Sequence, residues 1–271
     1  MFTKPKYPTY MLCLLCVLSL PGVGLSGPKD EKEVKEVKSE SKDVGKEAER
    51  ALSAANVLLE ITKTPESGIP QDLLNHADAI AVIPNVVKAA LGVGGRHGKG
   101  IVARRLPNSD WGAPAFIEVS GGSFGLQIGV SVTDVIFVFT NDDGLKGLLD
   151  DKVELGGDAG VAAGPVGRSA EAGTNVTFDS PIYSYSRSKG LFAGLALKGT
   201  VMTMDGSANR RLYGDKATGR DILFGSSLQA ATETKPFVDA LNRVAPKGTH
   251  EKKPMKTSKK QMWATPRQLA E

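Results

Sequence analysis

The chain has 271 residues and a formal net charge of +4, and 41% of its residues are hydrophobic, 24% charged and 6% aromatic. This composition is typical of a soluble globular protein, and the length is sufficient for one large domain with a buried core. Residues 51–234 are mildly acidic and lack a basic stripe with interleaved aromatic residues, which argues against a nucleic-acid-binding domain.

Residues 1–26 are typical of an export signal. Two lysines precede an apolar run, YMLCLLCVLSL, that is too short to span a membrane as a helix. We therefore expect an exported protein, periplasmic or extracellular and peripheral on a membrane, with an uncleaved N-terminal anchor as the alternative. Cys13 and Cys16 lie inside this segment, so the mature chain is expected to have no disulfide and no thiolate metal site.

Residues 27–44 are nearly all charged or polar, which predicts a charged linker or the frayed start of a helix. Over residues 45–62 the apolar positions recur with the i, i+3, i+4 spacing of an amphipathic helix. These positions are Ala48, Ala51, Leu52, Ala55, Leu58 and Leu59. Pro70 then starts a second short helix through QDLLNHA, because a missing N–H costs nothing in a first turn.

The chain from residue 79 onward is rich in β-branched residues, and several segments alternate with period two. Turn sequences such as NDDG and DGSAN separate these segments, so the sheet should be mainly antiparallel. We predict strands at 79–83, 100–105, 115–120, 123–132, 134–140, 152–164, 181–188 and 190–204. Short helices are expected at 142–151, in TGRDILFGS and at 236–244, and residues 245–271 predict a disordered basic tail.

These elements predict one α+β domain in which N-terminal helices pack on a twisted, mainly antiparallel sheet that closes into a barrel-like shape. The domain is expected to occupy residues 45–226, with a short helix and the basic tail at 227–271. The chain contains 31 glycines and few aromatic residues, which favours close backbone packing over large aromatic anchors.

The stretch GGSFG at 121–125 fits the G-x-S-x-G pattern of serine hydrolases. That motif needs a helix after the serine, whereas LQIGVSV alternates like a strand. The downstream histidine, His250, lies in the expected tail, and His76 and His97 lie upstream. We interpret the glycines as spacers in a close-packed strand and expect no catalytic residue. An enzyme remains one alternative function. It would be recognised by a hydrogen bond from His76 or His97 to a serine or carboxylate in a pocket.

Motifs for cofactors and metals are equally weak. GKGIVA at 98–103 matches a dinucleotide fingerprint, but a strand follows where that motif needs a helix. The three histidines have no recognisable zinc spacing. We therefore expect no cofactor and no metal.

Cations gather near glycine-rich turns, where exposed backbone N–H groups and nearby Arg or Lys hold phosphate or carboxylate groups. The candidate headgroup-binding residues are Lys88, Arg96, His97, Lys99, Arg104, Arg105, Arg168, Arg187 and Lys189. The candidates for membrane contact in the tail are Lys252, Lys253, Lys256, Lys259 and Lys260. For any single one of these residues, the alternative is a solvated loop charge.

Several longer segments, among them AIAVIPNVVK, GVGGRHGKGIVARR, IYSYSRSKGLFAGLALKGTVM and LYGDKATGRDILFG, together resemble the SYLF-domain family. The resemblance runs in order through residues 45–226. Eukaryotic members of this family are lipid- and actin-binding modules. The resemblance implies binding to membrane lipids, phosphatidylinositol lipids among them, through a basic surface and an amphipathic N-terminal helix, here residues 45–62.

On these grounds we expect a non-enzymatic exported protein that binds membrane lipids or phosphorylated headgroups through loop cations and the amphipathic helix. The alternative is a protein-interaction or scaffolding module of the cell envelope. No nucleic-acid partner is expected, and actin is not an expected partner of an exported protein.

Overall fold

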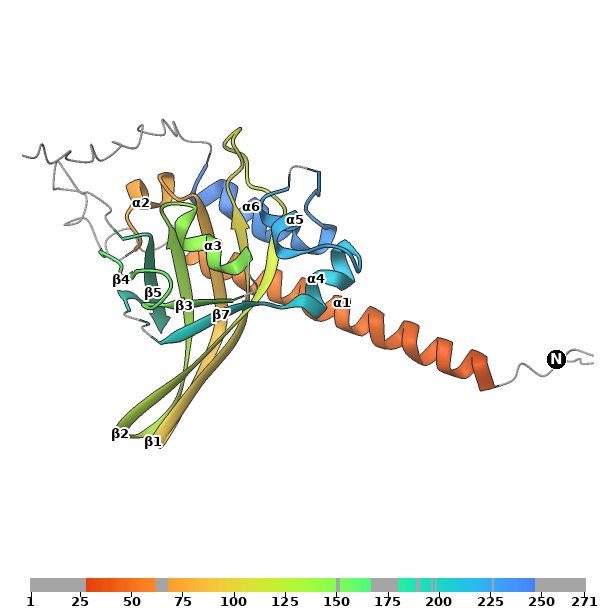
Figure 1. Cartoon of the computed structure of the whole chain (residues 1–271), viewed down its shortest axis with the longest axis horizontal. Coiled ribbons are helices and arrows are strands. Elements are labelled where there is room, and N and C mark those ends of the chain that lie inside the picture. The colour runs from red at the N-terminus through yellow and green to blue at the C-terminus, as the bar shows by residue number, and fades with distance from the viewer. Residues whose placement is uncertain are drawn as a thin grey trace, which may run out of the picture. The chain divides into compact units, whose positions relative to one another are not determined.

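The computed structural model describes residues 28–61, 68–149, 152–166, 180–188, 191–195, 197, 199–225 and 227–246 (Figure 1). Within these ranges, the side chains of 28–42, 92, 123–128 and 149 are not described. The elements in chain order are α1 (Pro28–Ile61), α2 (Gln71–Asn75), β1 (Ala79–Arg104), β2 (Ala115–Phe139), α3 (Asp143–Leu149), β3 (Lys152–Leu155), β4 (Val161–Ala163), β5 (Ile182–Ser188), β6 (Leu191–Gly194), β7 (Thr200–Met204), α4 (Gly206–Tyr213), α5 (Gly219–Leu223), η2 (Thr232–Thr234) and α6 (Lys235–Val244). The predicted export signal and most of the predicted basic tail lie outside the described residues.

Helix α1 begins at Pro28 and therefore includes nearly all of the charged segment 27–44. Of the two alternatives for that segment, a linker or the start of a helix, the structure has the helix. Proline is favoured in a first turn, and lysine and glutamate are good helix formers. The apolar positions of the predicted helix 45–62 mainly face the core, where Ala51 and Leu58 are fully buried. Most of this apolar face is therefore occupied by the fold, although Leu52 is exposed.

Strands β1 and β2 are much longer than predicted, because each merges segments that were expected to be separate strands. The first strand was predicted at 79–83, but it continues past Pro84 through a bulge between Ile83 and Val86. Asn85 adopts a positive φ of 53° at this bulge, and its backbone N–H donates to Asp134 Oδ1 at 2.9 Å. A bulge accommodates the missing donor of proline without ending the strand.

Strand β1 doubles back on itself near residue 92. A Cβ atom on Gly100 would lie 2.3 Å from the carbonyl oxygen of Val82, and one on Gly98 would lie 2.9 Å from Val86 Cγ2. Only glycine allows backbones to approach so closely. Because β2 pairs with β1 along its length, both strands form a ribbon that extends away from the helices (Figure 1).

The seven strands form one sheet in the order β3-β7-β2-β5-β4, with β1 paired to β2 and β6 paired to β5. All pairs are antiparallel except β4 with β5. The sheet is nearly closed and barrel-like, which confirms the predicted α+β class. The predicted strands 152–164 and 190–204 are each divided in two, giving β3 and β4 and then β6 and β7.

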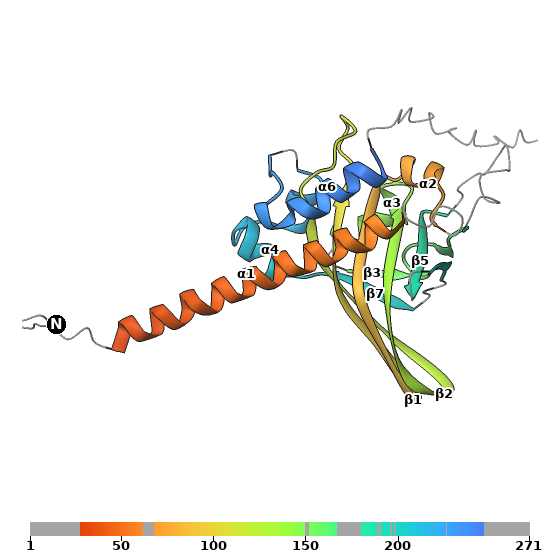
Figure 2. The same cartoon turned by 180° about the vertical axis from the view of Figure 1, so that it is seen from behind.

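Two apolar clusters lie on the two faces of the sheet, because alternate residues of each strand point to opposite sides. One cluster joins the sheet to α1, α2 and α6, which cover the same face (Figure 2). The other joins it to α3 and α5 and includes residues of β3 and β7. Because Phe237 and Leu241 of α6 are fully buried, the core includes residues beyond 226.

Candidate functional site

The GGSFG segment at 121–125 lies inside β2 rather than at a turn. Ser123 pairs with Gly94 of β1, and the strand continues beyond it. A Cβ atom on Gly121 would lie 3.1 Å from the carbonyl oxygen of Gly199, so a side chain would crowd the chain that enters β7. The nucleophile turn of a hydrolase needs a helix directly after the serine, and a strand stands there instead.

The histidines considered for catalysis lie on different elements. His97 is exposed on β1, where it pairs with Ser120 in the strand register. His76 follows α2 as its C-cap, and its Nδ1 lies 2.6 Å from the carbonyl oxygen of Asp72. In the part of the chain that the structure describes, no three His, Cys, Asp or Glu residues form a group that could hold a metal ion.

Arg105, a predicted headgroup ligand, is buried at the end of β1. Its guanidinium donates to four backbone carbonyl oxygens, at distances of 3.1 to 3.4 Å, and stacks 4.3 Å from the centroid of Trp111. The acceptors are the carbonyl oxygens of Ala77, Ser109, Ala245 and Pro246. Burial lowers the pKa of Arg105, and nearby Asp78 partly offsets this effect. These contacts join the end of α6 to the sheet.

Arg104 forms a bidentate interaction with Asp142. Its Nε and Nη2 atoms donate to the two carboxylate oxygens, both at 3.0 Å. The guanidinium also lies over the ring of Phe224, 4.3 Å from the centroid. Arg104 therefore holds the segment before α3 and the end of α5 against β1, and its charge has a partner within the protein.

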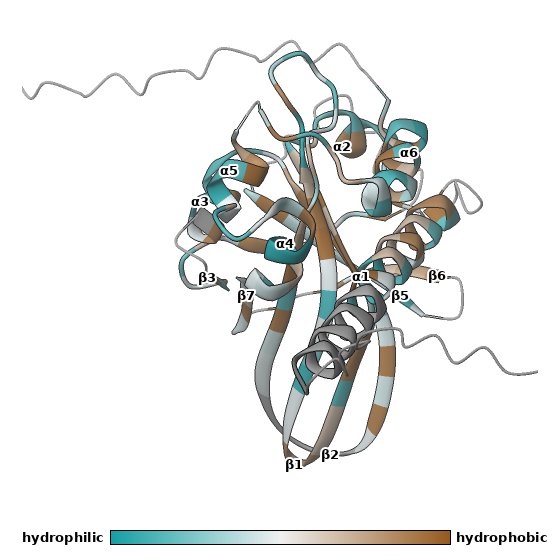
Figure 3. Ribbon diagram, turned by 90° about the vertical axis from the view of Figure 1, so that its right-hand side faces the viewer, coloured by the Kyte–Doolittle hydropathy of each residue, from teal (hydrophilic) through white to brown (hydrophobic). Residues whose placement is uncertain are grey.

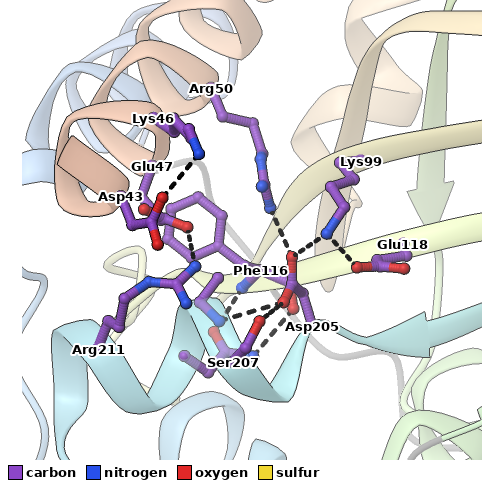
Figure 4. Close-up of polar contacts among 12 residues, drawn as sticks. Asp43, Lys46, Glu47, Arg50, Lys99, Phe116, Glu118, Asp205, Ser207 and Arg211 are labelled. Carbon is purple, nitrogen blue, oxygen red and sulfur yellow. Dashed lines mark hydrogen bonds and ion pairs between the residues drawn. The ribbon is translucent and has the colours of Figure 1, made fainter. Parts of the chain in front are cut away.

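Asp205 is the centre of the main buried polar cluster (Figure 4). It is the N-cap of α4, and its Oδ1 accepts hydrogen bonds from the backbone N–H of Ala208 at 3.1 Å and the hydroxyl of Ser207 at 2.8 Å. Its Oδ2 accepts from Arg50 of α1 and Lys99 of β1, both at 3.0 Å. One carboxylate thus links three elements that are distant in the sequence.

The charges in this cluster reinforce one another. Burial alone would raise the pKa of Asp205, but hydrogen bonds from Ala208, Lys99, Ser207 and Arg50 outweigh burial and hold that pKa well below its usual range. For Lys99, partial burial would lower the pKa, but its bonds to Glu118 and Asp205 raise it. The predicted ligand Lys99 therefore carries a charge that two carboxylates already neutralise.

Two further contacts dock α4, one on the start of β2 and one on α1. The side chain of Asn209 accepts a hydrogen bond from Phe116 N at 2.7 Å and donates one to Phe116 O at 2.9 Å. Arg211 donates to Oε1 of Glu47, which is only 1% exposed, at 2.5 Å. The segment DGSAN, predicted to be a turn, is therefore the capped start of helix α4. The sequence analysis did not recognise the structural role of its aspartate, Asp205.

The remaining predicted cations differ in their surroundings. Arg187 pairs with Asp134 at 2.6 Å, and its Nη1 lies 4.0 Å from Glu60 Oε2. Among the described side chains, no carboxylate pairs with Lys88, Arg96 or His97, and the buried Nε of Arg96 has no hydrogen-bond partner. The other predicted ligands lie outside the described residues; these are Arg168, Lys189, Lys252, Lys253, Lys256, Lys259 and Lys260.

The far part of the β1–β2 ribbon exposes apolar side chains. We call residues 86–97 and 120–133 the distal ribbon. Five of the eight exposed large apolar side chains among the described residues lie here, with Leu91 78% and Val130 74% exposed. The five are Val87, Leu91, Val93, Val130 and Val132. Figure 3 shows that hydrophobic segments alternate with less hydrophobic ones along this ribbon.

The strand register gives the distal ribbon two unlike faces. Val87 pairs with Val132 and Ala89 with Val130, whereas Lys88 pairs with Ser131. Directly opposed residues of antiparallel strands share a face, and neighbours along a strand point to opposite faces. One face is therefore apolar and the other polar. The distal ribbon contains Lys88, Arg96 and His97 but no Asp or Glu.

This apolar face was not predicted, although the alternation of Val87, Ala89, Leu91 and Val93 is a period-two signal in the sequence. The sequence interpretation placed no strand between residues 83 and 100, so this alternation was not used. Among the helices of the described residues, none combines the length and apolar character that crossing a bilayer would need.

Comparison with known proteins places most of the region from β2 to α6 in one family. A family model described as "Ysc84: Las17-binding protein actin regulator" matches residues 120–244. The chain is 37% identical over 179 residues to "LAS seventeen-binding protein 3" of Saccharomyces cerevisiae, a match that covers 65% of this chain and 38% of that protein.

Animal relatives are similar at comparable levels. "SH3 domain-containing YSC84-like protein 1" of Rattus norvegicus is 33% identical over 199 residues, which cover 72% of this chain and 58% of the relative. The protein of that name from Homo sapiens is 33% identical over 188 residues, 68% of this chain and 55% of the relative. The match thus spans between 38% and 58% of these relatives. With the helices and barrel-like sheet described above, these matches show that the chain belongs to the SYLF (Ysc84) family.

Proposed function

We propose that this domain binds the surface of anionic membranes through the distal ribbon. The observation that carries the proposal is an exposed apolar face on a segment that contains cations and no acidic residue. Apolar side chains gain about 25 cal/mol for each Å² removed from water. Basic residues near an anionic membrane surface add about 1 kcal/mol each. Apolar burial and electrostatic attraction therefore both favour membrane contact at the distal ribbon.

The ribbon is expected to lie in the interface rather than cross the bilayer. No third strand pairs with residues 86–91 or 128–133 in the described sheet, so the outer edges of the ribbon carry unpaired N–H and C=O groups. Such groups need water, and they are not tolerated in the hydrocarbon region. An amphipathic element meets this requirement when its polar face, here with Lys88, remains in the headgroup layer.

Within the predicted headgroup-binding group, Lys88, Arg96 and His97 are the residues proposed to contact phosphates. Lys99, Arg104, Arg105 and Arg187 have partners inside the protein. The apolar contact is assigned to the distal ribbon and not to residues 45–62, since most of the apolar face of that helix lies in the core.

The replacement Leu91→Asp combined with Val130→Asp is expected to reduce binding to anionic vesicles by tenfold or more. Both side chains are largely exposed, so the fold should not change. Losing the burial of one such side chain is worth about 1.5–3 kcal/mol, and about 1.4 kcal/mol corresponds to a factor of ten. The measurement is co-sedimentation with vesicles of phosphatidylcholine containing phosphatidylglycerol, with circular dichroism to check folding.

Leu191→Asp is the matched control, because Leu191 is 64% exposed but lies on β6, outside the distal ribbon. It should bind vesicles as the unchanged protein does. Equal binding by the double variant and the unchanged protein would refute the role of the ribbon. Absence of the unchanged protein from the vesicle pellet would refute the membrane function itself.

Removing residues 247–271 is expected to weaken binding to anionic vesicles and to make the remaining binding less sensitive to salt. The deleted segment contains the five tail lysines proposed to contact the membrane, and their attraction to anionic lipid is screened by ions. Sedimentation at low and high salt measures the effect, and neutral vesicles are the control. An unchanged salt dependence would exclude a contribution from the tail.

Protein binding is the second candidate function, and the family description favours it because it names an actin regulator. In that case the domain would co-sediment with actin filaments or another protein while ignoring vesicles. The export signal proposed at residues 1–26 would place either activity in the cell envelope or outside the cell, where cytoplasmic actin is not a partner.

A further inference from the structure

Two polar side chains flank Gly121 in the sheet. Gly121 of β2 pairs with Arg96 of β1 on one side and with Thr200 of β7 on the other. Directly opposed residues of antiparallel strands share a face, so the side chains of Arg96 and Thr200 lie on the same face, with the backbone of Gly121 between them. Leu155 of β3 continues this row and belongs to the second apolar cluster. The two polar side chains therefore lie where that cluster ends.

Both side chains bury a polar atom that has no hydrogen-bond partner. Thr200 is 1% exposed, and its hydroxyl oxygen has no partner in the protein. The Nε of Arg96 is also buried without a partner. An unsatisfied buried polar group costs about 1–3 kcal/mol, and more when the group is charged. Two such atoms in one row of the sheet point to a ligand that accepts hydrogen bonds from both.

The glycine at position 121 gives the arginine room to lie over the sheet. A Cβ atom on Gly121 would lie 3.4 Å from Arg96 Cγ and 3.3 Å from Thr200 Cα. The stem of Arg96 therefore passes over β2, and its Nε follows two bonds beyond Cγ. A larger side chain at position 121 would stand between the arginine and the threonine.

We infer that Arg96 and Thr200 form a binding site for a terminal phosphate group, carried either by a lipid or by free inorganic phosphate. The Nε and one Nη atom of a guanidinium form an edge that binds an oxyanion through two parallel hydrogen bonds, and the threonine hydroxyl donates a third. A terminal phosphate offers three strong acceptor oxygens and the opposite charge.

The surroundings of Arg96 favour an anion over a neutral ligand. The distal ribbon, in which Arg96 lies, contains no Asp or Glu that would repel a phosphate or compete with it for the arginine. The inference deepens the phosphate contact proposed above for Arg96. It rests on the proposed membrane function only where the phosphate belongs to a lipid.

The first arm of the test is a calorimetric titration of the protein with inorganic phosphate. The unchanged protein should bind saturably. Thr200→Val keeps the shape of the side chain and removes the hydroxyl, so binding should weaken about tenfold, the value of one hydrogen bond to a charged group. Thr200→Ser should restore binding. Because the hydroxyl has no partner in the protein, Thr200→Val should fold normally, which circular dichroism checks.

Two further variants separate the guanidinium edge from charge alone. Arg96→Lys keeps the positive charge but loses the planar edge, and it should also weaken phosphate binding about tenfold. Arg243→Gln removes an exposed cation of α6, outside the distal ribbon, and is the matched control that should bind phosphate as the unchanged protein does.

The second arm identifies the source of the phosphate with two kinds of vesicle at matched surface charge. Phosphatidic acid ends in a phosphate monoester, whereas phosphatidylglycerol contains only a diester. A preference for phosphatidic acid that Thr200→Val abolishes would identify a lipid. Binding of inorganic phosphate without this preference would identify the free ion.

The outcomes separate this inference from the proposed function. If neither arm shows binding that depends on Arg96 and on the hydroxyl of Thr200, the site assignment is wrong, and water satisfies the two buried atoms instead. If the unchanged protein binds neither kind of vesicle, the membrane proposal fails, and the titration with inorganic phosphate still decides the site.

Discussion

Replacing Asp205 with asparagine is expected to lower the free energy of unfolding by about 3 kcal/mol at neutral pH, the effect of breaking a buried ion pair. Asparagine is also a good N-cap, so the hydrogen bond from Ala208 N to this residue should survive. The variant therefore isolates the charge that Arg50 and Lys99 share. Urea unfolding followed by circular dichroism measures the loss.

The loss should depend on pH with a defined sign. The carboxyl of Asp205 has a pKa in the folded protein below its unfolded value of about 3.9. A lowered pKa contributes stability that is present above the unfolded pKa and is lost as pH falls towards the folded one. The difference between the unchanged protein and Asp205→Asn should therefore be largest near pH 6 and shrink below about pH 4.

Asp221→Asn is the matched control for this prediction. Asp221 also accepts hydrogen bonds at the start of a helix, from Thr218 at the N-cap of α5, but it is exposed. Its replacement should reduce stability much less than Asp205→Asn. If the two variants lose equal stability, the Asp205 cluster does not hold α1, β1 and α4 together in the way that its contacts indicate.

Arg105→Met is expected to lower the free energy of unfolding by about 3 kcal/mol or more. Methionine keeps an unbranched apolar stem but has no guanidinium to donate hydrogen bonds, so four backbone carbonyl oxygens lose a donor. Each buried acceptor without a partner costs about 1–3 kcal/mol. Urea unfolding measures the loss, and tryptophan fluorescence should report the change around Trp111.

Arg104→Met provides the comparison, since Arg104 pairs with the part-exposed carboxylate of Asp142. Exposed ion pairs contribute roughly 0–1 kcal/mol, so this variant should be the milder of the two. Equal losses would contradict the structural role of Arg105. They would also reopen its candidacy as a headgroup ligand, because the carbonyl contacts would then be dispensable.

The binding proposals follow from which cations the fold has already neutralised. A lysine or arginine that is bonded to a carboxylate gains less from an anionic headgroup, because the new contact must replace an existing one. Lys99 and Arg104 have such partners, whereas Lys88 has none among the described side chains and lies on the polar face of the distal ribbon. For this reason the proposal assigns membrane contact to the exposed ribbon rather than to the loop cations as a group.

The sequence alone was sufficient for the α+β class, the buried face of residues 45–62 and the strand character of 115–120 and 134–140. Those features repeat with a local period, and the apolar side of that period becomes the core. Rejection of the hydrolase motif rested on the same kind of signal, since residues after Ser123 alternate like a strand. The structure keeps them in β2.

Only the tertiary structure decided how β1 doubles back and which charges find partners. Arg50 and Asp205 are 155 residues apart, and the four acceptors of Arg105 are up to 141 residues away from it. Local periodicity contains no information about such pairs, because they form when separate elements pack. For the same reason, the sequence could not distinguish the cations that have partners inside the protein, such as Lys99 and Arg105, from those that remain at the surface.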